Sequence, residues 1–337
     1  MNTTGLAKYG AALLALAICS ACGGGLAVAP SNAAPSGAYT YVGRTLSVNG
    51  RLVTAARPPT SLPRYATILP DRHRKSKKFE YVINDYGSYA TIFDYPKSDQ
   101  QIGTINNVGG QGCTNVLYGY GKKIIWIVAA SNQIEEFKVP QTPIKTLSDS
   151  VGMPSSCAMD AGGDLAVGIL SGAGSGDVVI YKNASGSGTV YTTPLAEEFF
   201  DGYDNQGNLF ADGFTSSGFG LVELPKGSGK FQTITTSNAV QFPGSVQWDG
   251  KYVVVFDQSA NAFYRYTVSG TQATLESTIS IAGASDCAQT WIVKGFVYCG
   301  DDGGAGEVYK YPAGGSPVAV LTGNFDFPLG VTVAEKK

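Results

Sequence analysis

Histidine is the side chain that most often moves protons near neutral pH, and this chain of 337 residues contains one. His73 lies in the basic run Arg-His-Arg-Lys-Ser-Lys-Lys, where we expect it to be exposed to solvent. A Ser-His-Asp hydrolase needs a histidine beside its serine, and no Gly-x-Ser-x-Gly turn supplies that serine. The Gly-Ala-Gly-Ser-Gly segment at 172–176 falls in an expected loop. The sequence therefore disfavours serine-nucleophile chemistry.

Several acidic residues recur at one kind of place, between two strand-like segments. Asp160, Asp204 and Asp249 each begin a short turn that contains Gly or Asn. These residue types tolerate the left-handed backbone of tight hairpins, and an Asp side chain can bond the backbone two residues later. We therefore interpret the three carboxylates as turn formers rather than as catalytic acids.

The strand pattern is clearest from Phe242 to Ile281. Strand-forming residues occupy 245–248, 252–257, 262–267 and 274–281, and Gly, Asn, Asp and Ser separate them. This arrangement predicts a four-stranded antiparallel meander. One such sheet cannot bury both of its faces alone, so it needs neighbours of the same kind.

The same unit repeats along the chain. Its third strand is marked near the end by residues 42 to 45 positions apart: Tyr95, Phe137, Tyr181, Leu224, Tyr266 and Tyr311. Six copies of four antiparallel strands predict an all-β fold, a six-bladed β-propeller. The first copy, 79–106, has three strands, and the segment 327–334 matches an inner strand. We expect the C-terminal strand to enter the first blade and close the ring, which limits edge-to-edge association and favours a monomer.

The N-terminal residues are typical of an export signal. Lys8 supplies positive charge, and the apolar run at 10–18 is too short to span a bilayer. The letters Cys-Ser-Ala-Cys-Gly at 19–23 are similar to a bacterial lipobox whose lipidated residue is Cys22. A lipid on Cys22 would anchor the protein in the cell envelope, at the outer membrane or the cell surface. The alternative is cleavage after Ala21, which gives a soluble secreted protein.

Composition divides the rest of the chain. Residues 1–22 are the predicted lipoprotein signal peptide, 23–40 a flexible tether, 41–78 an N-terminal arm, and 79–335 the propeller. The segment around Asn49-Gly50 is typical of a small hairpin within the arm. A net charge of −2 and a pI near 5.5 do not favour a nucleic-acid partner.

Export implies an oxidising compartment, so the cysteines after Cys22 are expected to form disulfides. Cys113 and Cys157 lie at matching places in consecutive repeats. Cys287 precedes an inner strand, and Cys299 ends the strand beside it. We predict the pairs Cys113–Cys157 and Cys287–Cys299. No Cys-x-x-Cys pair is present, which disfavours zinc.

The segment Tyr203-Asp-Asn-Gln-Gly-Asn-Leu-Phe210 resembles a hairpin of six-bladed NHL-repeat and gluconolactonase-like propellers. The segments 223–227, 242–250 and 311–315 resemble uncharacterised bacterial propeller lipoproteins. The resemblance covers about 79–335. Gluconolactonase-like membership implies a divalent metal held in the channel by Glu, Asn and Asp on inner strands. Here the inner strands offer Asn115, Asp201 and Gln247, with no Glu expected at a matching place.

Two functions remain open. The first is a non-enzymatic ligand-binding or protein-interaction scaffold with no cofactor. Its contact patch would be aromatic, unless these rings pack between blades: Tyr118, Tyr120, Phe199, Phe200 and Phe214. The second is a metal-dependent lactonase or hydrolase in which Asn115, Asp201 and Asp286 hold Ca²⁺ at the channel mouth. Gln247 is a further binding candidate at the same mouth.

Overall fold

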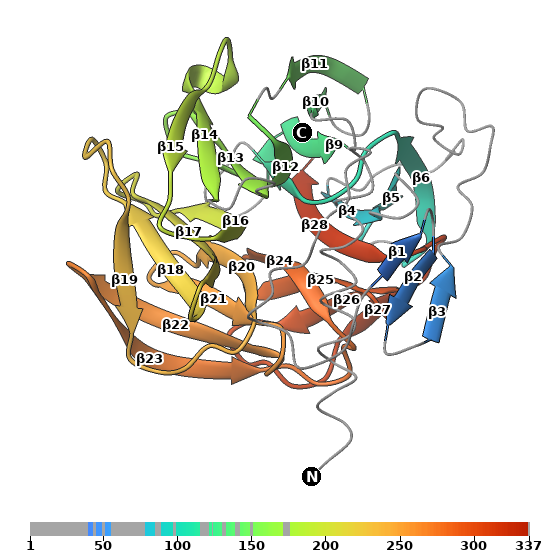
Figure 1. Cartoon of the computed structure of the whole chain (residues 1–337). Helices are drawn as coiled ribbons and strands as arrows, with labels where there is room; N and C mark the ends of the chain where they lie inside the picture. Colours follow the sequence, from blue (N-terminus) through green and yellow to red (C-terminus); the bar gives the residue numbers. More distant parts are fainter. Residues whose placement is uncertain are drawn as a thin grey trace.

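The computed structural model describes residues 40–42, 45–48, 51–54, 78–84, 89–96, 99–114, 121–122, 124–129, 133–138, 142–148, 151–170 and 176–335. Within these ranges the regular elements are strands and one 3₁₀ turn at Lys182–Ala184, so the fold is all-β. The sheets are arranged in a propeller-like fashion (Figure 1). Across the same ranges, no helix has the length and apolar character needed to cross a membrane.

The predicted meander is present. Its strands are β20 (Pro243–Trp248), β21 (Val253–Asp257), β22 (Ala262–Ser269) and β23 (Gln272–Ser280), and consecutive strands pair antiparallel. Asp249 stabilises the first turn because its Oδ1 accepts the backbone N–H groups of Lys251 and Tyr252 at 2.9 and 2.8 Å. Asp160 and Asp204 accept backbone N–H groups in the corresponding turns. Their interpretation as turn formers is confirmed.

The same four-stranded unit recurs along the chain. Within each unit the strands pair with one another in chain order. The remaining units are β7 (Gly112–Thr114), β9 (Ile124–Ala129), β10 (Gln133–Lys138) and β11 (Thr142–Ser148); β12 (Met153–Met159), β13 (Leu165–Leu170), β14 (Asp177–Tyr181) and β15 (Thr189–Thr192); β16 (Glu197–Tyr203), β17 (Leu209–Thr215), β18 (Gly218–Leu224) and β19 (Gln232–Thr236); β24 (Cys287–Val293), β25 (Phe296–Asp301), β26 (Ala305–Lys310) and β27 (Ala319–Leu321). The first strands contact one another in chain order: β7 with β12, β12 with β16, β16 with β20, and β20 with β24. They therefore place their residues around a shared centre.

The C-terminal strand joins the first repeat, as predicted. β28 (Pro328–Glu335) pairs antiparallel with β4 (Lys78–Asn84), which continues into β5 (Tyr89–Phe93) and β6 (Gln101–Asn106). Figure 1 shows β28, in red, beside β4. Val331 and Val333 are buried in the core, so the tail contributes apolar packing as well as backbone hydrogen bonds. β28 also pairs in parallel with the short strand β8 (Gly121–Lys122).

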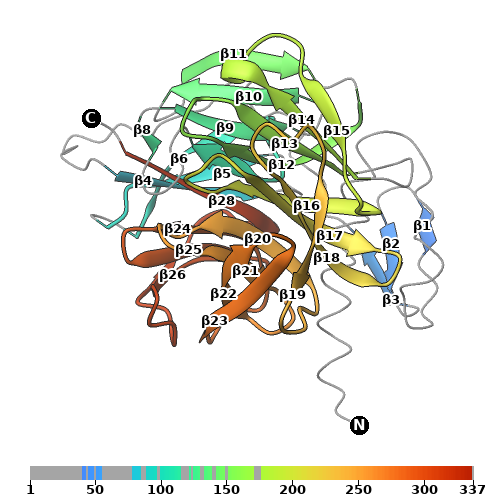
Figure 2. The ribbon, with the colours of Figure 1, turned by 90° about the vertical axis from the view of Figure 1, so that its left-hand side faces the viewer.

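Neighbouring units also touch at their outer edges. β19 and β23 pair in parallel and merge two meanders into one eight-stranded sheet (Figure 2). Isolated bridges join Ile281 to Gly315 and Gln100 to Thr322. These contacts cover edges that would otherwise offer unpaired backbone groups.

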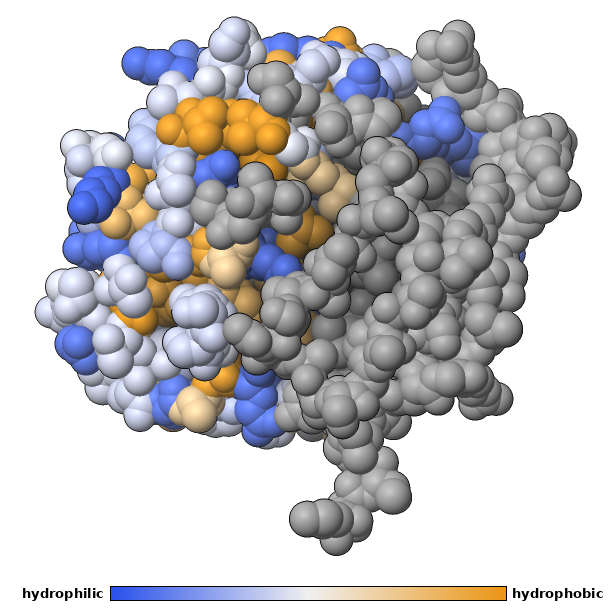
Figure 3. All heavy atoms as spheres, viewed as in Figure 1, coloured by the Kyte–Doolittle hydropathy of each residue, from blue (hydrophilic) through white to orange (hydrophobic). Residues whose placement is uncertain are grey.

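Buried apolar clusters fill the spaces between the units. One cluster joins β12–β14 to β16–β18, and another joins β16–β18 to β20–β23. On the face seen in Figure 3, apolar and polar residues are interspersed. The arm contributes a separate three-stranded sheet of β1 (Thr40–Val42), β2 (Thr45–Val48) and β3 (Arg51–Thr54). The pairing of β2 with β3 confirms the hairpin expected around residues 49 and 50.

Candidate functional site

A small cavity lies where the first strands converge. Its volume is about 30 Å³, enough for roughly two water molecules. It is lined by residues of β7, β12, β16, β20 and β24 and by neighbouring Gln111, with polar groups from Thr114, Asp201 and Gln247 among them. This cavity is the candidate site because five units of the fold line it and four of them contribute polar side chains.

Asp201 is the acidic residue of the cavity wall. It lies on β16 and is 7% exposed, and neither carboxylate oxygen has a hydrogen-bond partner of normal geometry among the described residues. Burial raises the pKa of Asp201 well above its ordinary value, and the nearby Ser156 hydroxyl and Gly168 amide offset part of the rise. A buried carboxyl of this kind is stable when it is protonated or when a cation lies beside it.

Glu198 lies behind Asp201 on the same strand and is fully buried. Its Oε2 accepts a hydrogen bond from the Ser155 hydroxyl at 3.1 Å, and its Oε1 accepts one from Ser156 at 3.2 Å. Burial, and then repulsion from Asp201, raise the pKa of Glu198 well above its ordinary value. The inner strand β16 therefore carries a buried Glu as well as Asp201.

The strand register shows that Glu198 occupies a position that holds proline in two other inner strands. In β12 and β28 the residue just before the bulge is a proline, Pro154 and Pro328, whereas in β16 it is Glu198. Space for the carboxylate comes from Gly168 on β13, since a Cβ there would lie 2.0 Å from Oε2. Gly176 adds room on the backbone side, because its Cβ would lie 2.7 Å from the Glu198 nitrogen. Two glycines thus form a slot that fits this side chain.

A third buried carboxyl, Asp212, belongs to the other face of the sheet. It pairs with Phe200, whereas Asp201 pairs with Ala211, so Asp201 and Asp212 point to opposite faces. Burial raises the pKa of Asp212 well above its ordinary value, Glu198 raises it further, and the Gly244 amide opposes the rise. The three carboxyls therefore do not form a single ligand set.

Amide side chains hold the first strands together at the cavity. Gln247 donates to the Ile292 carbonyl at 3.1 Å and accepts from the Ile292 N–H at 2.7 Å. Gln289 makes the same two contacts with Gly112. Gln111 donates to the Phe199 carbonyl at 3.1 Å, while its Oε1 has no partner within the described parts of the chain. Gln247, a predicted binding residue, therefore has both ends of its amide engaged by backbone.

The predicted ligand residues are only partly brought together. Asp201 and Gln247 share the cavity wall, whereas Asp286 lies in the loop before β24 and does not line it. The Asp286 backbone N–H donates to Asp301 Oδ1 at 2.9 Å. Asn115 falls outside the described residues, as do His73 and the predicted lipidation site Cys22.

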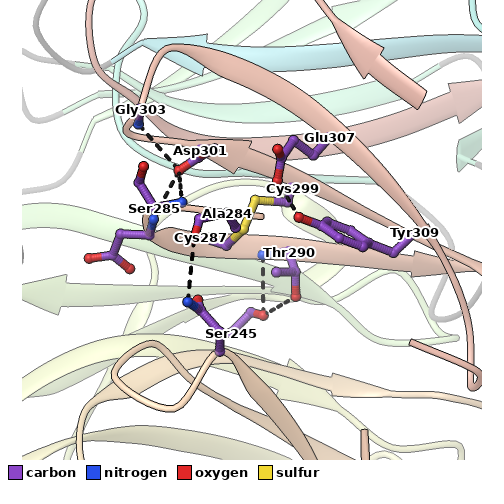
Figure 4. The surroundings of a disulfide bond; sticks show 12 residues. Ser245, Ala284, Ser285, Cys287, Thr290, Cys299, Asp301, Gly303, Glu307 and Tyr309 are labelled. Carbon is purple, nitrogen blue, oxygen red and sulfur yellow. Dashed lines mark hydrogen bonds between the residues drawn. A yellow bond between two sulfur atoms is a disulfide. The ribbon is translucent and has the colours of Figure 1, made fainter. Parts of the chain in front are cut away.

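Both predicted disulfides are confirmed. Cys113 pairs with Cys157 and Cys287 with Cys299, and the Cα atoms are 5.6 Å apart in each pair. Figure 4 shows the second disulfide beside Glu307, whose carboxylate accepts from the Tyr309 hydroxyl. Within the described residues these two sulfurs and Glu307 form the one cluster with metal-ligand spacing. The sulfurs are joined to each other, so they do not offer thiolates to a metal.

The predicted aromatic patch is divided. Phe200 packs in a buried cluster, whereas Phe199 and Phe214 are partly exposed and contact each other at 5.6 Å between ring centroids. Phe242, which the sequence did not single out, joins them at 5.1 Å from Phe214. Tyr118 and Tyr120 lie outside the described residues.

Comparisons with known proteins give little beyond this geometry. No protein-family model matches the sequence, and no curated protein matches it. Among solved structures, the chain is similar to the "Structure of U3-55K", with a TM-score of 0.45 and 10% identity. The match covers 59% of this chain and 61% of that one. A likeness this low says nothing about function.

Proposed function

We propose that this chain is an exported, lipid-anchored, six-bladed β-propeller that serves as a non-enzymatic ligand-binding or protein-interaction scaffold in the bacterial cell envelope. The proposed divisions are a signal peptide at 1–22, a tether at 23–40, an arm at 41–78 and the propeller at 79–335. The support for export and anchoring is the charged and apolar N-terminus that ends at Cys22.

Support for six blades comes from the first strands. β7, β12, β16, β20 and β24 each contact the next, and β28 contacts both β24 and β7. A ring of this kind leaves no free edge between its first and last members. The closure by β28 supports the same proposal.

The observation that carries a binding rather than a catalytic role is the size of the central cavity. At about 30 Å³ it is roughly ten times smaller than the pockets that hold small-molecule substrates. Its amides at Gln247 and Gln289 are engaged in joining strands. A ligand would then bind on the loops at one face of the ring, where propellers and other rigid scaffolds present variable residues.

Fractionation tests the anchor, and an activity assay tests the role. Wild-type protein is expected in the membrane fraction and Cys22→Ser in the soluble one, with Cys19→Ser as the matched control that stays with membranes. Purified protein is expected to leave a panel of sugar lactones intact, with or without added Ca²⁺. A soluble wild-type protein would contradict the anchor, and calcium-dependent lactone hydrolysis would contradict the scaffold.

One observation favours the second candidate, a metal-dependent lactonase or hydrolase. Gln111 Oε1 and Thr114 Oγ1 line the cavity without hydrogen-bond partners among the described residues, and the Asp201 oxygens beside them have none of normal geometry. These are oxygen donors, the type that Ca²⁺ prefers, so the residues fit a hard cation. When bound, such a cation would polarise a substrate oxygen. The chain's own contribution would be the Asp201 carboxylate that holds it.

Calcium binding separates the two candidates. The lactonase hypothesis predicts that Ca²⁺ raises the melting temperature of the protein and that Asp201→Asn abolishes this rise. Asp286→Asn is the matched control, because Asp286 lies outside the cavity wall. Stoichiometric metal lost with Asp201→Asn and accompanied by turnover would replace the scaffold proposal. A melting temperature that does not change when Ca²⁺ is added would rule out the lactonase hypothesis.

A further inference from the structure

A half-buried glutamate is paired across two strands with an aromatic residue at one end of β16. Glu197 opens this strand, and across the described residues it makes no hydrogen bond or ion pair through its side chain. Burial raises its pKa. Its register partner on β17 is Phe214. Side chains of paired residues stand on the same face of a sheet, with Cβ atoms about 5 Å apart, so Glu197 and Phe214 share one face at this end of the sheet.

Three rings form a corner at this place. Phe214 meets Phe199 at 5.6 Å with an interplanar angle of 86°, and it meets Phe242 at 5.1 Å with an angle of 83°. Phe199 and Phe214 are partly exposed, while Phe242 is buried. Among the described residues, neither Phe214 nor Phe242 belongs to the buried clusters that join the units. Phe242 is a buried core residue, and Phe199 packs against the cluster that joins β16–β18 to β20–β23. The corner therefore lies at the rim of the core, with Phe199 and Phe214 partly open to solvent.

Acidic residues outnumber basic residues in this unit. The unit β16–β19 carries six acidic residues: Glu197, Glu198, Asp201, Asp204, Asp212 and Glu223. Its two basic residues, Lys226 and Lys230, follow β18. They come after the end of the unit that holds the Asp204 turn, and Phe214 lies at the opposite end. Glu198, Asp201 and Asp212 are buried and have raised pKa values, so the half-buried Glu197 is the carboxylate that attracts positive charge at the aromatic end.

We propose that Glu197, Phe199, Phe214 and Phe242 form a binding site for a small organic cation that carries a quaternary or protonated ammonium group. The faces of phenyl rings are negative, and perpendicular rings with a carboxylate are the arrangement that recognises such groups. The central cavity, at about 30 Å³, cannot hold an organic cation, so this site is separate from it. The proposal rests on the binding function above and supplies its ligand class.

Choline and its neutral isostere 3,3-dimethyl-1-butanol test the site on the purified full chain at low salt by calorimetry. We expect choline to bind saturably at millimolar concentration and the isostere at least about tenfold more weakly. Glu197→Gln should weaken the affinity for choline by about tenfold. Phe214→Leu, which keeps apolar volume, should weaken this affinity by about threefold or more. Glu223→Gln is the matched control. It removes another half-buried carboxylate of the same unit, one already bonded by Gln232.

Three outcomes would overturn the site. They are an absence of saturable choline binding, equal binding of the isostere, and unchanged affinity in Glu197→Gln. Phe242→Leu serves as the second ring variant if Phe214→Leu is unfolded by circular dichroism. Failure here leaves the scaffold proposal in place, because that proposal is contradicted by membrane fractionation or by lactone turnover rather than by choline.

Discussion

The hydroxyl of Ser156 donates a hydrogen bond to Oε1 of Glu198 at 3.2 Å, across the boundary between β12 and β16. A second donor, Ser155, reaches the other oxygen at 3.1 Å. The two bonds make the buried Glu198 a strut between consecutive units, and no basic side chain is paired with it in the described structure. Burial and the neighbouring Asp201 favour the protonated form of this carboxyl, and the two hydroxyl donors offset part of that preference.

The pH dependence of stability follows from this strut. The folded-state pKa values of Glu198 and Asp201 are raised, so the folded chain binds more protons than the unfolded chain above about pH 4. Their contribution to stability is complete below the unfolded pKa and is lost as pH rises toward the folded pKa. We expect Glu198→Gln to reduce the loss of unfolding free energy between pH 5 and pH 8 by about 1–3 kcal/mol, measured by urea denaturation.

A surface carboxylate provides the comparison. Glu276 is exposed on β23, and Glu276→Gln should leave the pH profile of the unfolding free energy unchanged. Asp201 and Asp212 remain in the Glu198→Gln variant, so part of the pH dependence persists. A Glu198→Gln profile parallel to that of the wild type would show that Glu198 is ionised in the fold.

A methyl group added at Gly168 would occupy the space that now holds the Glu198 carboxylate. Gly168→Ala places a Cβ 2.0 Å from Glu198 Oε2 and 2.3 Å from Ser156 Oγ. The backbone of Gly168 has no positive φ, so alanine is strained only by these contacts. We expect a loss of about 1–3 kcal/mol in unfolding free energy, measured by urea denaturation.

A double-mutant cycle isolates the carboxylate in that effect. In a Glu198→Ala background the added methyl group has space, and the Ser156 hydroxyl can rotate away. Gly168→Ala should therefore destabilise that variant by at least about 1 kcal/mol less than it destabilises the wild type. Equal losses in both backgrounds would mean that Glu198 does not occupy the slot.

Local patterns account for the parts of the fold that could be predicted. Asp-initiated turns at Asp160, Asp204 and Asp249 set the strand boundaries, because their side chains bond the next few backbone amides. Equivalent positions in a repeat then brought Cys113 and Cys157 together. These inferences needed only short-range chemistry and a period.

The buried carboxyls could not be found in the same way. Alternation along Glu-Glu-Phe-Phe-Asp at 197–201 does not show which residues face inward, because a bulge between Glu198 and Phe200 shifts the register. The binding role expected for Gln247 likewise depended on a neighbour 45 positions away, Ile292, whose backbone engages its amide. A comparison of Glu198 with Pro154, counted back from the Asp204 and Asp160 turns, is the signal that would have singled out Glu198.

The two disulfides should differ in how much each contributes to the free energy of unfolding. Cys113 and Cys157 are 44 positions apart and join two units, whereas Cys287 and Cys299 are 12 apart within one unit. Loop-closure entropy predicts a loss of about 4 kcal/mol for the paired variant C113A/C157A and about 3 kcal/mol for C287A/C299A. Denaturant titration of each variant, with the other disulfide intact, measures the difference. The reverse order would indicate that packing around Glu307 and Tyr309 outweighs loop length.

Removal of the C-terminal strand should expose the first unit. Deletion of 328–337 uncovers one edge of β4 and takes away the buried side chains of Val331 and Val333. Backbone amides of β4 should then exchange with solvent faster by about tenfold or more, and unfolding should lose cooperativity. Deletion of 336–337 alone is the control, since it leaves β28 intact. Amide protection of β4 that survives the longer deletion would show that β4 and β5 hold their sheet without the tail, and the ring would then owe its closure to contacts between other units.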